Sequence, residues 1–154
     1  MILDELHAMP GHLIRRAQQI AVSVFMEECG ELDLTPVQYA ALIAIGENEG
    51  IDATRLSALI AFDRSTLGSV LERLETRGLV SRYFLPDDKR IKRLKLTASG
   101  RTLVARADKA VRRAQERMLT TLPPKDRDKF LQLLDQFVAA NNDVSRVPQR
   151  AAGL

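Results

Sequence analysis

The sequence predicts a mainly α-helical fold with one small β-hairpin. Apolar residues recur at the spacing of amphipathic helices through most of the 154 residues, whereas a stretch at 79–97 alternates apolar and charged residues. The composition agrees: 45% hydrophobic residues are enough to bury a core, and 5% aromatic residues with no Trp argue against a β-sandwich.

The chain carries no run of about 18 apolar residues that could span a membrane. Its first residues include acidic side chains, where a secretory signal peptide would be basic. Cys29 is the only cysteine, which excludes an intrachain disulfide and fits a reducing compartment. We therefore expect a cytoplasmic protein without membrane contact.

Positive charge is concentrated in one quarter of the chain. The net charge is +3, but residues 64–101 hold ten Lys and Arg against four Asp and Glu, so this segment carries +6 and the rest −3. Such a patch is typical of a surface that binds polyphosphate. For any single residue, a solvated charged face is the alternative.

The first predicted helix begins at Pro10 and ends near Glu28. Proline suits the first helical position, and the apolar residues that follow fall at helical spacing. Their stripe is broad, which indicates packing on a partner as well as on the chain's own core. The stripe consists of Leu13, Ile14, Ala17, Ile20, Ala21, Val24 and Phe25.

A second helix begins after Thr35 and ends near Glu47. Thr35 and Gln38 have the spacing of a capping box, in which each side chain bonds the backbone N–H of the other residue. Gly50 closes the turn that follows.

Two short helices come next, at 52–60 and 63–77, separated only by Ala61 and Phe62. Asp63 can cap the second of them, and Gly78 suits its left-handed end. This arrangement predicts a helix-turn-helix. The residues of the second helix that point inward are Leu67, Val70, Leu71 and Leu74.

The segment after Gly78 predicts two short strands around a turn at Pro86-Asp87-Asp88-Lys89. Leu94 and Leu96 alternate with Arg93 and Lys95, as a half-exposed hairpin requires. A hairpin directly after a helix-turn-helix is a wing, so the lobe is predicted to be a winged helix-turn-helix.

Two more helices complete the predicted order. Thr97 can cap a long helix that extends to about Thr120, and Pro123 and Pro124 open a last helix. We expect the tail after Val144 to be frayed. The apolar residues of these helices are Leu103, Ala107, Val111, Ala114, Met118, Phe130, Leu131, Leu134, Phe137 and Val138.

The helix that starts at Asp63 is predicted to enter the major groove of double-stranded DNA. Small hydroxyl side chains near its N-terminus allow close approach and can reach base edges, and an arginine can pair with guanine. Gly68 costs roughly 1 kcal/mol of helix propensity, which suggests close backbone approach to DNA or to the preceding helix. An ordinary amphipathic surface helix is the alternative. The candidate DNA-binding residues here are Arg64, Ser65, Thr66, Ser69 and Arg73.

The hairpin adds five cations within seven residues. An arginine at its tip can enter a minor groove while its neighbours neutralise phosphates, and Asp88 is placed to hold the guanidinium of Arg90. A charged edge strand that only prevents aggregation is the alternative. The candidate DNA-binding residues of the wing are Asp88, Lys89, Arg90, Lys92 and Arg93, with Lys95 as the fifth cation.

DRSTLGSVLERLETRGLVSR at 63–82, followed by DDKRIKRLKLTASG at 87–100, resembles the MarR family of winged-helix regulators, and the likeness extends over nearly the whole chain. The resemblance implies a homodimer in which residues 1–34 and 101–154 form the dimerisation region and residues 35–100 the DNA-binding lobe. It also implies wing-tip roles for Asp88 and Arg90. The two recognition helices would bind a palindromic operator whose half-sites lie roughly 10 bp apart.

The resemblance further implies repression that is released by a small aromatic or heteroaromatic carboxylate, bound between the dimerisation helices and the lobe. The residues that could bind its carboxylate are His7, His12, Arg15 and Arg16, because an arginine pairs with a carboxylate through two hydrogen bonds. A solvated or purely structural role is the alternative for each of them.

Two other functions are alternatives. Some members of the family sense peroxide through a cysteine, but the acidic neighbours of Cys29 would raise its pKa and disfavour a thiolate. A helical module whose winged lobe binds protein instead of DNA is the second. The sequence carries no metal, thiol-dyad or phosphate-loop motif, so we expect neither an enzyme nor a cofactor.

Overall fold

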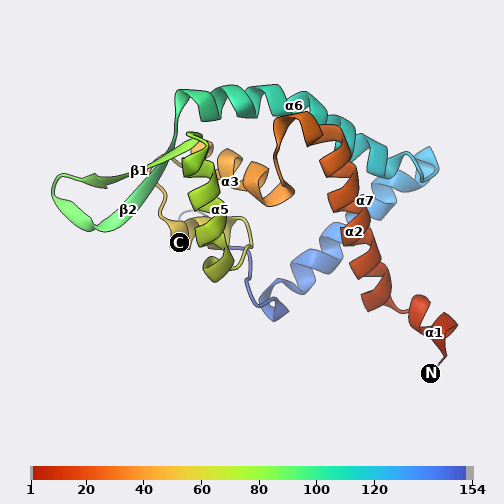
Figure 1. Cartoon of the computed structure of the whole chain (residues 1–154). Helices are drawn as coiled ribbons and strands as arrows, with labels where there is room; N and C mark the ends of the chain where they lie inside the picture. Colours follow the sequence, from red (N-terminus) through yellow and green to blue (C-terminus); the bar gives the residue numbers. More distant parts are fainter. Residues whose placement is uncertain (1, 152–154) are drawn as a thin grey trace.

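A computed structural model describes residues 2–151 (Figure 1). The winged lobe lies at one end, and the long helix α6 joins it to α2 and α7 at the other end. The elements are α1 (Leu3–His7), α2 (Pro10–Cys29), a 3-10 turn η1 (Gly30–Leu32), α3 (Pro36–Glu47), α4 (Ala53–Leu59), α5 (Arg64–Thr76), β1 (Val80–Leu85), β2 (Asp88–Leu96), α6 (Ala98–Leu119), α7 (Pro124–Ala140) and a second 3-10 turn η2 (Asn142–Val144).

The helix order follows the prediction, with one addition at the start. α1 was not expected, because five residues are too few to show a helical repeat. Its first turn is held by the Glu5 carboxylate, which accepts a hydrogen bond from the backbone N–H of Ile2 at 3.0 Å. No helix of residues 2–151 is long and apolar enough to cross a membrane.

The core of the lobe is built around α3. The predicted capping box is present: the backbone N–H of Gln38 donates to Thr35 Oγ1 at 3.3 Å, and that of Thr35 donates to Gln38 Oε1 at 3.0 Å. α3 packs against α2, α4, α5, α6 and β2. Its buried residues include Leu42, which the sequence pattern had not singled out. The large side chains that are fully buried in the core are Leu34, Leu42, Ile45, Leu56, Leu67, Leu71, Leu74 and Leu94.

The helix-turn-helix is confirmed. Asp52 caps α4 by accepting from the backbone N–H groups of Thr54 and Arg55, each at 2.9 Å. Asp63 caps α5 by accepting from the N–H of Thr66 at 3.2 Å. Ala61 takes a left-handed conformation, with φ of 50°, which turns the chain within the very short joint.

The wing is a two-stranded antiparallel sheet, but its turn is tighter than predicted. Leu85 pairs with Asp88, so only Pro86 and Asp87 connect the strands, and Asp88 and Lys89 belong to β2. The predicted turn at 86–89 was therefore wrong in its placement, because pairing with β1 outweighs the low strand propensity of Asp and Lys. The predicted burial of Leu94 and Leu96 is confirmed.

The end of the wing is fastened to the start of α6. Thr97 Oγ1 donates to the carbonyl of Gly78 at 2.6 Å and accepts from the N–H of Gly100 at 3.0 Å. Gly78 has the predicted left-handed backbone, with φ of 67°. A Cβ on Gly100 would lie 2.1 Å from the carbonyl oxygen of Leu79, so only glycine fits there. These contacts fix the direction in which α6 leaves the lobe.

Outside the lobe, α2 and α6 are joined by ion pairs. Arg117 Nη2 lies 2.6 Å from Glu27 Oε2, and Arg113 Nε lies 3.3 Å from Glu28 Oε2. The apolar residues predicted for the last helix are exposed in the single chain. They are Phe130, Leu131, Leu134, Phe137 and Val138 of α7, and Leu133 beside them is exposed as well. Large apolar side chains are also exposed on α1 and α2, namely Leu3, Leu6, Leu13, Ile14, Ile20 and Met26.

The segment after Val144 is not frayed through residue 151, which corrects the prediction. It runs back from α7 to the lobe (Figure 1), where the backbone N–H of Arg150 donates to the carbonyl of Ala58 at 2.9 Å. The sequence pattern did not predict this contact, because it is made by backbone groups and by the side-chain amide of Gln149, which donates to the carbonyl of Leu59. Such contacts leave no apolar stripe in the sequence.

Candidate nucleic-acid interface

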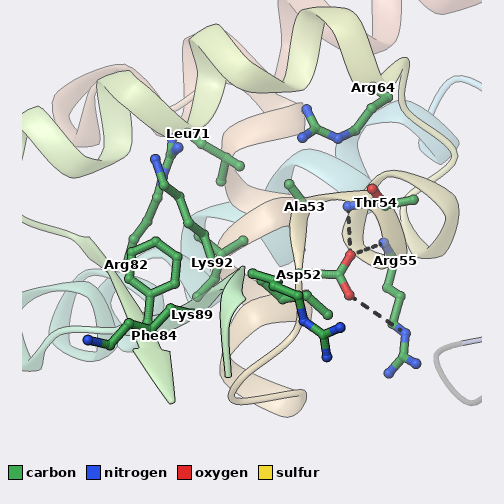
Figure 2. A pocket seen from close by; sticks show the side chains of 13 residues that line it. Asp52, Ala53, Thr54, Arg55, Arg64, Leu71, Arg82, Phe84, Lys89 and Lys92 are labelled. Atoms are coloured by element: carbon green, nitrogen blue, oxygen red, sulfur yellow. Dashed lines mark hydrogen bonds and ion pairs between the residues drawn. The ribbon is translucent and has the colours of Figure 1, made fainter. Parts of the chain in front are cut away.

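A basic groove lies between the helix-turn-helix and the wing. It has a volume of about 690 Å³. Figure 2 shows α4 and α5 side chains on one wall and wing side chains on the other. Its polar and charged lining residues are Asp52, Thr54, Arg55, Arg64, Arg82, Lys89, Arg90 and Lys92, and its apolar ones are Ala53, Leu71, Phe84, Ile91 and Leu94.

The electrostatic character of the groove is positive. Six of its lining residues are Lys or Arg and only Asp52 is acidic. The Asp52 carboxylate is already used, because it caps α4 and lies 3.7 Å from Arg55 Nε (Figure 2). The groove therefore keeps an excess of positive charge toward an external anion.

The exposed face of α5 carries the polar residues that the sequence placed there. Ser65, Thr66, Ser69 and Arg73 are all exposed. The hydroxyls of Ser65 and Thr66 donate to Asp63 Oδ2, and these bonds hold the pKa of Asp63 below its usual value. The two hydroxyl hydrogens are thus engaged, which leaves the oxygens free to accept hydrogen bonds from base amino groups.

The wing tip has the predicted contact between Asp88 and Arg90. Asp88 Oδ1 accepts from both the backbone N–H and the Nε–H of Arg90, each at 3.1 Å. These two bonds lower the pKa of Asp88. The Arg90 side chain is nevertheless 90% exposed, so its guanidinium is oriented without being covered.

The five wing cations do not share one role. Lys89, Arg90 and Lys92 line the groove. Arg93 instead turns inward, where its Nη1 donates to the carbonyl of Gly50 at 3.1 Å and fastens the wing to the loop between α3 and α4. Lys95 lies over the ring of Tyr83, with Nζ 5.2 Å from the centroid.

The groove also contains residues that the sequence analysis missed. Thr54 and Arg55 come from the first helix of the helix-turn-helix, and Arg82 and Phe84 come from β1. Arg82 Nε lies 2.8 Å from Glu75 Oε2, which ties β1 to α5. A search for cations over the whole lobe would have found the arginines, but only the fold brings them to one groove.

The four candidate ligand-binding residues gather where α1 meets α2, far from the wing (Figure 1). The His7 and His12 rings lie 4.9 Å apart, and Arg15 Nη2 lies 3.4 Å from His12 Nδ1. Partial burial and the charge of Arg15 lower the pKa of His12. Arg16 is exposed. The best-formed pockets of residues 2–151 are lined by other residues.

Cys29 is fully buried in the core. Burial, followed by the charge of Glu28, raises the pKa of its thiol, and a buried protonated thiol reacts slowly with oxidants. Among residues 2–151, no group of three or more His, Cys, Asp or Glu side chains is arranged to hold a metal ion.

Comparisons with known proteins agree on one family. A sequence model described as MarR family matches residues 32–91. The transcriptional regulator HosA of Escherichia coli is 35% identical over 108 residues, which cover 70% of this chain and 80% of HosA. The similarity to HosA extends well beyond the segment that the family model matches.

Solved structures share the fold over most of the chain. The repressor CouR, bound to a 23-mer DNA duplex, is 31% identical with a TM-score of 0.80, covering 90% of this chain and 98% of CouR. BpsR of Bordetella bronchiseptica, whose DNA binding is regulated by 6-hydroxynicotinic acid, is 28% identical with a TM-score of 0.78, covering 85% of this chain and 94% of BpsR.

Proposed function

The chain belongs to the MarR family of winged-helix transcriptional regulators, and we propose that it is a homodimeric repressor that binds a palindromic operator and is released by a small aromatic or heteroaromatic carboxylate. The observation that carries the DNA-binding part is the groove between α4, α5 and the wing, whose six cations face a single acid that is already paired. The DNA-bound structure of CouR supports the same use of this fold.

Recognition of the DNA base sequence is assigned to the exposed face of α5. Ser65, Thr66 and Ser69 are short enough to let the helix lie deep in the major groove, and Arg73 is long enough to pair with a guanine. Affinity is assigned to the cations, because phosphate contacts release counterions whatever the base sequence. The residues with this second role are Arg64, Lys89, Arg90 and Lys92, with Asp88 orienting Arg90 and Arg93 holding the wing in place.

Dimerisation is assigned to residues 1–34 and 101–154. The exposed apolar side chains of α1, α2 and α7 form faces that a second copy would cover; such faces are unusual on a monomer. A twofold axis through them would present two α5 helices to one face of a duplex, with half-sites about one helical turn apart.

The effector is proposed to bind near His7, His12, Arg15 and Arg16, in a cleft that the partner subunit completes. The lowered pKa of His12 favours its neutral ring, so the arginines would supply the charge that binds a carboxylate. The regulation of BpsR by 6-hydroxynicotinic acid supports this chemical class. Release follows if the ligand favours a lobe spacing that does not fit adjacent major grooves.

A salt titration tests the DNA-binding proposal. Binding of the protein to a duplex that it selects from a random library should weaken steeply with salt, with a slope of about 0.9 for each phosphate contact. If DNA binding depends only weakly on salt while the winged lobe still binds a protein partner, the result would instead support the alternative in which the lobe binds protein. Deletion of the gene should raise expression from a promoter fusion that carries the selected site, and a fusion that fell silent would contradict repression.

A thermal-shift screen tests the effector proposal. An aromatic carboxylate present at a hundredfold excess over its Kd stabilises the protein by about 2.7 kcal/mol, which corresponds to roughly 5 to 10 °C for a chain of this size. Arg15→Gln should abolish the shift, whereas Arg112→Gln, an exposed change on α6, should retain it. A flat screen across hydroxylated and heteroaromatic acids would contradict the proposal.

A further inference from the structure

The segment after η2 is attached to the helix-turn-helix at two points. The backbone N–H of Arg150 donates to the carbonyl of Ala58 at 2.9 Å, and Gln149 Nε2 donates to the carbonyl of Leu59 at 3.2 Å. Both carbonyls lie in the last turn of α4, where the usual donor four residues later is missing; the Ala58 carbonyl also accepts from the backbone N–H of Ala61 at 3.4 Å. The segment therefore caps the first helix of the helix-turn-helix.

The same segment is closed on itself. The side chain of Asn142 bonds the backbone of Gln149 in both directions, donating to its carbonyl at 3.2 Å and accepting from its N–H at 2.8 Å. Arg150 Nη1 also lies 2.8 Å from Asp143 Oδ1. We call residues 142–150 the strap; these bonds fix the path of its backbone from α7 to the lobe.

The strap carries Arg146 to the N-terminus of α5. Arg146 Nη2 lies 3.8 Å from Asp63 Oδ1, and the Arg146 side chain is 91% exposed. An ion pair with this separation and exposure contributes little to stability. The guanidinium is thus held near the start of α5 but remains available to another anion.

A cation beside the N-terminus of α5 would offset the negative charge of Asp63. Asp63 brings a negative charge to the end of the helix that enters the groove, and its low pKa keeps it ionised. Phosphates that flank this end of the helix would be repelled by the carboxylate. Arg146 supplies a compensating charge from outside the winged lobe.

We propose that the strap places Arg146 against a DNA phosphate beside the N-terminus of α5, so that the C-terminal segment of each subunit takes part in operator binding. This inference rests on the proposed DNA-binding function. It extends the interface from the winged lobe to a segment that follows the last long helix, and it gives Asn142 the role of a positioning residue.

Arg146→Gln tests the contact. In a dimer two phosphate contacts are lost, so the slope of log Kd against log salt should fall by about 1.8, with unchanged base preference and melting temperature. Arg146→Lys, which keeps the charge, should retain most of the slope, and Arg112→Gln should leave it unchanged. An unaltered slope for Arg146→Gln, beside a reduced one for Arg90→Ala, would overturn the inference and leave the DNA-binding proposal standing. A wild-type protein without salt-dependent DNA binding would overturn both.

Asn142→Ala tests the strap. Loss of the two bonds to Gln149 should release Arg146, lower the salt slope and make the strap more sensitive to protease. The double variant Asn142→Ala, Arg146→Gln should then bind no worse than Arg146→Gln alone, because both changes remove the same contact. Fully additive losses, or an Asn142→Ala variant with a wild-type slope, would show that the strap does not position Arg146.

Discussion

Among single residues, substitution of Arg73 and of Arg90 by alanine is expected to affect DNA binding in different ways. Arg90→Ala should weaken binding to all duplexes and reduce the salt slope by about 1.8 for the dimer, because it removes a charge from each wing. Arg73→Ala should also relax base preference at one position of each half-site, by about 1 to 3 kcal/mol. Binding curves with the operator and with point-substituted operators measure both effects.

Arg112→Ala is the matched control for this pair. Its side chain is exposed on α6 and pairs with Asp108 at 2.9 Å, away from the groove. Unchanged binding by both Arg73→Ala and Arg90→Ala would contradict the assignment of these surfaces.

Gly68 gives a prediction in which stability and binding change in opposite directions. A Cβ at this position meets no atom within 4 Å, so packing on the preceding helix does not explain the glycine. Gly68→Ala should stabilise α5 by about 1 kcal/mol, yet weaken operator binding because the added methyl group faces the DNA. Urea unfolding and operator titration check the two effects. Higher stability with unchanged affinity would place Gly68 outside the interface.

Contacts between residues close in sequence could be predicted, whereas contacts between residues far apart in sequence could not. The contact of Asp88 with Arg90 follows from a spacing of two residues. Arg93 was predicted to bind DNA, and its bond to the Gly50 carbonyl, which lies 43 residues earlier, was not predicted. Only the fold shows that Arg93 fastens the wing.

At the scale of elements, the junction of β2 with α6 depends on Gly100. A Cβ there would lie 2.1 Å from the backbone oxygen of Leu79, which cannot move as a side chain can. Gly100→Ala should therefore destabilise the protein by about 3 kcal/mol despite the better helix propensity of alanine. The midpoint of urea unfolding, at fixed protein concentration, measures the change.

Gly11→Ala is the control for that change. A Cβ on Gly11, in the first turn of α2, meets nothing within 4 Å, so this variant should be as stable as the wild type or slightly more so. Equal midpoints for Gly100→Ala and the wild type would mean that α6 can shift away from Leu79 at little cost.

Caps and periodicity were sufficient to place most elements. Thr35, Asp63 and Thr97 all accept the hydrogen bonds that their positions predicted. The wing turn was misplaced because strand pairing, not local propensity, decides where it closes. The strap escaped prediction because its contacts join residues about 90 positions apart.

At the scale of the whole molecule, the apolar face of α7 is expected to hold the dimer together. Leu134→Glu should give a monomer, because it would bury a charge at the interface. The residue is exposed in a single chain, so helix content should be retained. Gln132→Glu adds the same charge to an exposed polar position of α7 and should remain dimeric. Sedimentation equilibrium measures the mass, and a Leu134→Glu dimer would contradict the role of this face.

The proposed effector site is the part of the molecule that a single chain leaves most incomplete. His7, His12 and Arg15 lie together, as their places in the sequence indicated, but a cleft needs walls that the α1–α2 end of one subunit does not supply. The winged lobe, in contrast, forms its core and its groove from a single chain. Sequence patterns therefore predicted its helices and hairpin, although they did not predict every residue that meets in the groove.

Selection of bound duplexes from a random library tests whether paired α5 helices bind a palindromic operator. We expect enrichment of a palindrome whose half-sites are centred roughly 10 bp apart, bound by one dimer per duplex. Arg73→Ala should select the same spacing with a weaker preference within each half-site. A library that stays random under wild-type selection, or a selected site without twofold symmetry, would contradict a dimeric regulator that binds its operator through paired α5 helices.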